Sequence, residues 1–139
     1  MTQGLKTFAE FAADFPDPEW DRHGGDDYPA GRPIAVWLRD TLTREGFRCS
    51  EVENHDSYGW AFDVSVERAT IWCMLQSSER WLLITQCKRK LLDALRGRSC
   101  DAEHRRLLDA IVRALEGDPR VRDSAWFARA DYQAQASRR

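Results

Sequence analysis

The sequence predicts an α+β domain: a mainly antiparallel meander sheet of four to six strands with helices packed on one face. The first observation is an alternation within residues 60–67, where large apolar side chains alternate with small or polar ones, as in a strand with one buried face. The second is a pair of apolar runs, 69–76 and 81–87, separated only by the polar turn 77–80. The third is a set of helical stripes on either side of these strands. The alternating apolar residues are Trp60, Phe62, Val64 and Val66.

Length and composition fit one domain. The chain has 139 residues, of which 42% are hydrophobic and 32% charged, which is ordinary for a globular protein. We expect a single domain over residues 1–127. Residues 128–139 have no hydrophobic period and are expected to form a frayed polar tail.

The sequence also indicates where the protein is expected to be located and which classes of partner are not expected. No apolar run approaches the roughly 20 residues that span a bilayer, so no membrane association is expected. The N-terminus has no basic region followed by an apolar core, and a cytoplasmic location is therefore expected. Residues 88–106 hold seven basic and three acidic side chains, without any nucleic-acid-binding motif, so no nucleic-acid partner is expected.

The first element, residues 5–15, has two interpretations. Thr7 and Glu10 form a capping box, and Phe8, Phe11 and Phe15 fall close to helical spacing. A helix is therefore preferred. However, Phe11, Ala13 and Phe15 also alternate, so a strand added to the sheet remains the rival.

Residues 16–32 are rich in proline, glycine and acids and are expected to be a long loop. Asp17, Glu19 and Asp21 alternate as calcium ligands often do. An EF-hand would also need Gly at its sixth position and Glu at its twelfth, where this chain has Arg22 and Tyr28. No metal is predicted, although the sequence leaves open whether the loop binds a cation.

The remaining elements have clearer signals. Pro33 begins a helix that Gly46 ends, and residues 47–53 are expected to be an outer strand pairing with the one near Tyr58. Turn-forming side chains at 54–57 connect the two. Two helices and a last strand are expected at 88–96, 101–117 and 121–127. We expect the longer helix to bury its stripe against Phe62 and Val64; the stripe includes Leu108, Ile111, Val112 and Leu115.

The four cysteines show no metal-binding or redox spacing. Cys49, Cys73, Cys87 and Cys100 are 24, 14 and 13 positions apart, with no Cys-x-x-Cys pair. All four are expected to be free thiols in a reducing compartment. A zinc site with His55 or His104 is not favoured by the spacing.

Catalytic motifs are missing from the sequence. His55 stands beside Asp56, but adjacent residues rarely orient one another, and a capped turn is the better interpretation. If the chain were an enzyme with a scattered site, His23, His55 and His104 would be the acid/base candidates. No catalytic residue and no cofactor is predicted.

Four stretches together carry a loose resemblance to known proteins: 33–42, 59–66, 81–85 and 120–127, which include a Gly-Trp followed by alternating hydrophobics and a later Trp-Leu-Leu-Ile. They resemble small uncharacterised bacterial α+β proteins, among them immunity proteins of polymorphic toxin systems. The resemblance implies a cytosolic protein that binds and blocks one toxin, with no catalytic residues.

The function predicted is therefore a non-catalytic protein-binding module. The alternative is a small-ligand-binding domain with an apolar pocket between sheet and helices. In the strand at 69–76 both faces are apolar, so a helix layer on one face leaves Trp72 and Met74 on the other. The candidate partner surface combines these two with the acidic loop at their rim: Trp72, Met74, Trp20, Asp21 and Tyr28.

Overall fold

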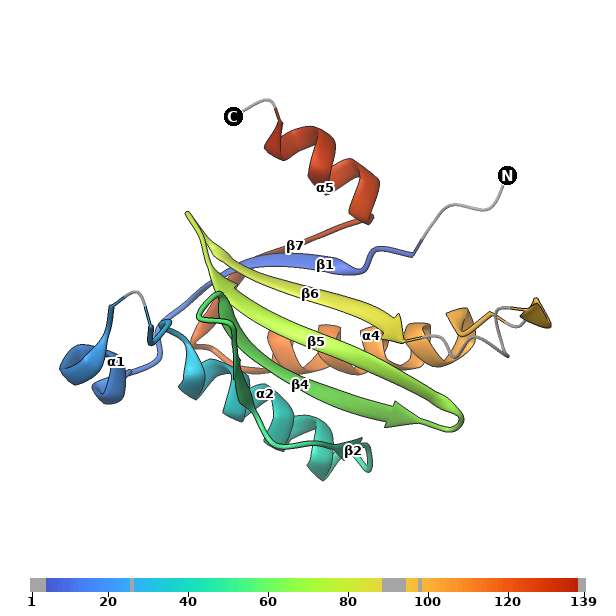
Figure 1. The fold of residues 1–139 in the computed structure, drawn as a ribbon, viewed down its shortest axis with the longest axis horizontal. Coiled ribbons are helices and arrows are strands. Elements are labelled where there is room, and N and C mark those ends of the chain that lie inside the picture. The colour runs from blue at the N-terminus through green and yellow to red at the C-terminus, as the bar shows by residue number, and fades with distance from the viewer. Residues whose placement is uncertain (1–4, 26, 89–94, 98, 138–139) are drawn as a thin grey trace.

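The computed structural model describes residues 5–25, 27–88, 95–97 and 99–137. Its elements in chain order are β1 (Phe8–Ala13), α1 (Pro18–His23), α2 (Arg32–Arg44), β2 (Arg48–Cys49), β3 (Glu53–His55), β4 (Gly59–Val66), β5 (Ala69–Ser77), β6 (Trp81–Lys88), α4 (Asp101–Gly117), β7 (Val121–Phe127) and α5 (Arg129–Ala136). Figure 1 shows the sheet in front of α2 and α4.

The sheet is antiparallel, and its centre is the predicted meander. Within the described residues seven strands pair in the order β2-β4-β5-β6-β1-β7, with β3 also pairing with β4. In the β4–β5 register Phe62 lies opposite Cys73, and in the β5–β6 register Cys73 lies opposite Thr85. The fold class is confirmed. The strand number exceeds the expected four to six, partly because two short strands, β2 and β3, form where one outer strand at 47–53 and a turn at 54–57 were expected.

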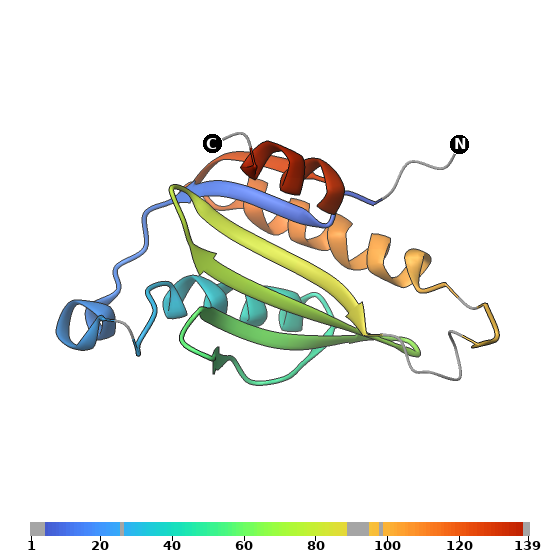
Figure 2. The ribbon, with the colours of Figure 1, turned by 45° about the horizontal axis from the view of Figure 1, so that its top comes forward.

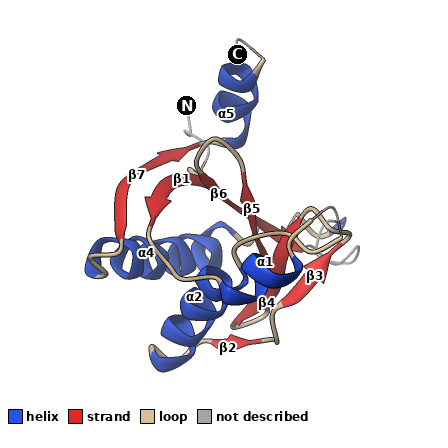
Figure 3. Ribbon diagram, turned by 90° about the vertical axis from the view of Figure 1, so that its left-hand side faces the viewer, coloured by secondary structure: helices blue, strands red, loops and turns tan. Residues whose placement is uncertain are grey.

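One face of the sheet carries the hydrophobic core under α2 and α4 (Figure 3). α2 buries Ile34, Leu38 and Leu42 at helical spacing. α4 buries Leu108, Ile111 and Leu115, whereas Val112, also expected in the core, is half-buried. Two strand positions expected opposite α4 belong to the same cluster, Phe62 and Val64.

The preferred helix at residues 5–15 is wrong, because Phe8–Ala13 form strand β1. This strand lies between β6 and β7, with Ala9 opposite both Leu83 and Trp126. The pairing satisfies the backbone groups of three strands at once and buries Ala9 and Phe11 in the core. Long-range pairing therefore outweighs the local capping signal.

The polar tail expected at 128–139 contains helix α5, so the expected fraying is not what the structure shows for Arg129–Ala136. Its Tyr132 ring lies 5.3 Å from the ring of Phe8 and 6.1 Å from that of Phe127, centroid to centroid. These two aromatic partners are distant in sequence from one another. The helix is thus held by tertiary contacts that a local hydrophobic period does not reveal.

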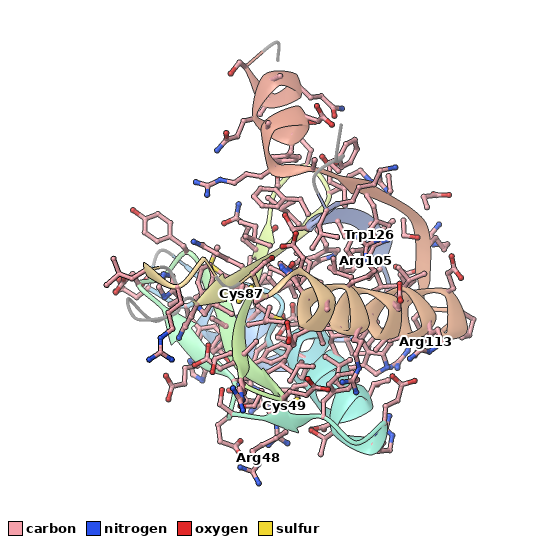
Figure 4. The ribbon with its side chains drawn as sticks, turned by 90° about the vertical axis from the view of Figure 1, so that its right-hand side faces the viewer. Arg48, Cys49, Cys87, Arg105, Arg113 and Trp126 are labelled. Carbon is pink, nitrogen blue, oxygen red and sulfur yellow. A yellow bond between two sulfur atoms is a disulfide. The ribbon has the colours of Figure 1, made fainter. Side chains whose placement is uncertain are left out.

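The prediction of four free thiols is also wrong, because Cys87 and Cys100 form a disulfide. The bond connects the end of β6 to the residue before α4 (Figure 4). Spacing in sequence did not indicate this pair, because the antiparallel sheet and α4 bring the two positions together only in the fold. The helix expected at 88–96 lies mostly outside the described residues.

A thiol titration checks the disulfide. The unfolded, unreduced protein is expected to react with two equivalents of a thiol reagent, from Cys49 and Cys73, and with four after reduction. In the folded protein Cys73 is expected to stay unreactive, because complete burial raises the pKa of its thiol. Four reactive thiols without reduction would contradict the pairing.

Candidate binding groove on the open face

The face of the sheet opposite α2 and α4, here called the open face, carries large apolar side chains. Successive side chains of a strand point to opposite faces. Ile71, Cys73 and Leu75 of β5 belong to the core cluster, so Trp72 and Met74 point to the open face. Three further apolar residues of the open face come from β1 and β6: Phe8, Leu82 and Ile84.

Two hollows on this face are lined by described residues, and the larger of them has a volume of about 490 Å³. Met74, Leu82 and Ile84 line it from the sheet, and α5 adds Arg129, Tyr132 and Gln133. The three α5 residues are spaced i, i+3 and i+4, which places them on one side of the helix. α5 rises beyond β1 and β7 on the side away from α2 and α4 (Figure 3), so it forms one wall of the hollow. Figure 2 shows α5 next to β1 and β7 in a second view.

The smaller hollow, of about 270 Å³, lies toward β3 and β4 and is polar. Trp72 lines both hollows and thus separates them. The His55 ring meets the Trp72 ring edge-on, with centroids 5.1 Å apart. Lys88 Nζ lies 2.9 Å from a carboxylate oxygen of Asp63. We call the two hollows and the Trp72 side chain between them the groove; the remaining acids of its polar end are Glu51 and Glu53.

A buried polar chain lies beside the larger hollow, where β1 begins. Thr85 Oγ1 donates to the carbonyl oxygen of Thr7 at 2.9 Å and lies 2.7 Å from His104 Nε2. A hydroxyl has a single proton, so His104 Nε2–H donates to Thr85 and the neutral ring carries its proton on Nε2. Burial lowers the pKa of His104. This histidine is therefore neutral near pH 7 and holds α4 to β6.

The lowered pKa of His104 predicts acid sensitivity. The unfolded chain binds a proton at the ordinary histidine pKa of 6.5, above the folded value, so the unfolded state binds more protons as the pH falls below 6.5 and stability decreases. Urea denaturation at pH 7.5 and 5.5 is expected to show a lower midpoint at pH 5.5. The variant His104→Gln should have a lower midpoint at pH 7.5 and a smaller change between the two pH values. An unchanged pH dependence in His104→Gln would contradict this role.

The structure separates the five predicted partner-surface residues into two groups. Trp72 and Met74 line the groove. By contrast, Trp20 and Asp21 lie on the short helix α1, where the sequence predicted only loop, and Tyr28 lies in the segment after it. This part of the chain lies at the end of the sheet, and among the described residues it lines neither hollow. The Tyr28 ring packs on Trp60, a core residue, with centroids 5.2 Å apart.

Hydrogen bonds between residues distant in sequence explain the position of this segment. Trp60 Nε1 donates to the Pro29 carbonyl at 2.8 Å, and Asp17 Oδ2 accepts the Gly31 amide at 2.8 Å. Gly31 has a φ of 104°, and a Cβ there would lie 2.6 Å from the Trp81 ring, so only glycine fits. Asp17 also accepts the amide of Trp20 and caps α1. The acid that suggested a cation ligand thus serves as a capping residue.

Sequence reasoning missed most of the groove, including five residues of its larger hollow. Leu82 and Ile84 had an available signal, since Trp81–Thr85 of β6 is apolar on both faces, as β5 is. No such signal was available for Phe8, Arg129 and Tyr132, because residues 5–15 were predicted as a helix and residues 128–139 as a frayed tail.

The described residues contain neither a membrane-spanning helix nor a metal-binding cluster. No helix among them is long and apolar enough to cross a bilayer. No three or more His, Cys, Asp or Glu side chains in the described ranges are grouped so that they could hold a metal ion. The acid/base candidates His23, His55 and His104 lie on different elements, α1, β3 and α4.

Comparison with known proteins does not assign the groove a role. The chain matches no protein-family model, no curated protein and no solved structure.

Proposed function

We propose that this chain is a non-catalytic binding module that holds an apolar segment of a partner protein in the groove. One observation carries the proposal: the sheet face that α2 and α4 leave open has an apolar hollow of about 490 Å³. Its aromatic, methionine and aliphatic lining is of the kind enriched in the centre of protein interfaces. Concave, mostly apolar surfaces with a few polar groups are typical of binding sites.

The polar groups around the larger hollow support binding rather than catalysis. Gln76, Gln86 and Gln133 are amides, which donate and accept hydrogen bonds but do not transfer protons near neutral pH. His104 is 5% exposed and is engaged with Thr85. A cytosolic toxin, as the resemblance to immunity proteins implies, is one class of partner that this proposal covers.

A small apolar ligand is the second candidate, favoured by the size of the hollow, which falls within the roughly 300–1,000 Å³ of ligand sites. The predicted position of such a pocket, between sheet and helices, is occupied by core side chains such as Leu38, Phe62 and Ile111. A ligand would therefore occupy the open face as well. A peptide and a small molecule are distinguished by whether binding extends past Trp72 to the polar end of the groove.

Selection from a random dodecapeptide display library tests the proposal. Peptides recovered on the wild-type protein are then titrated by fluorescence polarisation against two variants. Trp72→Ala is expected to weaken binding at least tenfold, because buried aromatic anchors dominate interface energies. Trp20→Ala, an exposed tryptophan outside the groove, is the matched control and should change affinity less than twofold. No recovered peptide, or equal binding to wild type and Trp72→Ala, would overturn the proposal.

A further inference from the structure

The two ends of the groove differ in charge. Among the described residues that line the larger hollow, Arg129 has the one cationic side chain and none is acidic, since His104 is neutral there. The smaller hollow has three acids, Glu51, Glu53 and Asp63, against Lys88. The Lys88 ammonium is already bound by Asp63. The groove thus changes from positive at α5 to negative at β3.

Arg129 is placed to reach a bound group. It is the first residue of α5 and lies one turn before Tyr132 and Gln133, on the side of the helix that lines the larger hollow. The side chain of Arg129 is exposed, so its guanidinium is accessible to a binding partner. A guanidinium binds a carboxylate through paired hydrogen bonds, which an amide or a neutral group does not match.

We propose that the partner segment carries a carboxylate side chain directly beside its apolar anchor residue, and that Arg129 binds this carboxylate. The inference rests on the proposed binding function and specifies the partner's chemistry. The apolar anchor occupies the hollow between α5 and β5. The acids near β3 repel a carboxylate, which fixes the direction of the segment: its acidic residue lies toward α5.

The span of the groove sets the length of the segment. Five neighbouring strands, β1, β6, β5, β4 and β3, form the floor. With strands about 4.8 Å apart, the crossing is about 19 Å. An extended chain advances about 3.3 Å per residue, so about six residues cross the groove. The partner surface is therefore a short linear segment with its acid at one end.

Three end-capped hexapeptides of one sequence test the inference. Each has Leu-Phe as the anchor, followed by Glu, Gln or Lys, with Ser at the other positions. Isothermal titration at low salt is expected to rank their affinities for the wild-type protein Glu above Gln above Lys. The preference of Glu over Gln should be two- to fivefold, as for an exposed ion pair. It should shrink in high salt because exposed charges are screened.

Charge variants of the protein make the test specific. In Arg129→Gln the Glu and Gln peptides should bind equally, and in Arg129→Glu the Lys peptide should bind best. Arg105→Glu is the matched control, since it makes the same change in net charge on α4 (Figure 4), and it should leave the wild-type ranking intact. If the ranking of the three peptides changes as much in Arg105→Glu as in Arg129→Glu, the cause is the net charge of the protein and not Arg129. That result would overturn the inference.

Two further outcomes separate this inference from the proposed function. Equal binding of all three peptides, lost in Trp72→Ala, would overturn the role of Arg129 and leave the groove as a binding site. Failure of every hexapeptide to bind would also overturn the inference. In that case the random-library selection still decides the proposed function independently.

Discussion

Replacing Ile111 with alanine is expected to lower the free energy of unfolding by about 2–5 kcal/mol. Ile111 is fully buried on α4, in one cluster with Phe62 and Val64 of the sheet and Leu38 of α2. Removal of its side chain leaves a cavity where α4, α2 and the sheet meet. The cost combines lost burial of apolar atoms with the lost contacts around that cavity.

Urea denaturation of Ile111→Ala and of Asp109→Ala measures this effect. Asp109 is exposed on the same helix, so its replacement keeps the helix and should change stability by less than about 0.5 kcal/mol. An Ile111→Ala midpoint equal to that of the wild type would mean that α4 does not pack on the sheet as described.

Replacing Phe11 with alanine is expected to cost about 3–5 kcal/mol. Phe11 is 1% exposed and lies on β1 opposite Trp81 of β6. Because β1 lies between β6 and β7, a cavity there weakens the packing that connects the meander to the edge strand β7. The change therefore affects both neighbours of β1.

The variant Phe11→Leu is the control for side-chain volume. It keeps most of the buried apolar surface and should cost less than about 1.5 kcal/mol in the same denaturation experiment. A loss below about 1 kcal/mol for Phe11→Ala would contradict the burial of this side chain within the sheet.

The parts of the fold that sequence predicted are those with unambiguous local patterns. In β4, Trp60, Phe62 and Val64 alternate with small or polar residues, and the short turns allow only antiparallel neighbours. The stripe of α4 is similarly clear, since Ile111 and Leu115 repeat at helical spacing. In such segments the local period and the tertiary environment favour the same structure.

The incorrect predictions concern segments whose structure depends on distant partners. Residues 8–13 fit a helix or a strand, and pairing with β6 and β7 selects the strand. Tyr132 anchors α5 through Phe8, a partner more than one hundred positions earlier in the chain. The Cys87–Cys100 pair likewise depends on how β6 and α4 are placed.

The candidate site was predicted in part, for the same reason. The two-sided apolar pattern of β5 placed Trp72 and Met74 on the face opposite α2 and α4. The second half of the predicted surface, Trp20, Asp21 and Tyr28, was added only because the loop is long and acidic. Its position is determined by hydrogen bonds to Gly31 and Trp60, which have no signature in sequence.

Methionine methyl NMR tests most directly whether the open face is the binding surface. The sequence has two methionines, Met1 and Met74, and Met74 lines the larger hollow. Protein labelled with ¹³C at methionine methyl groups is titrated with a peptide recovered from the library, and the signal of Met74 is assigned with Met74→Leu. The Met74 signal is expected to shift with the peptide's binding curve. A Met74 signal that does not move at saturating peptide would contradict it.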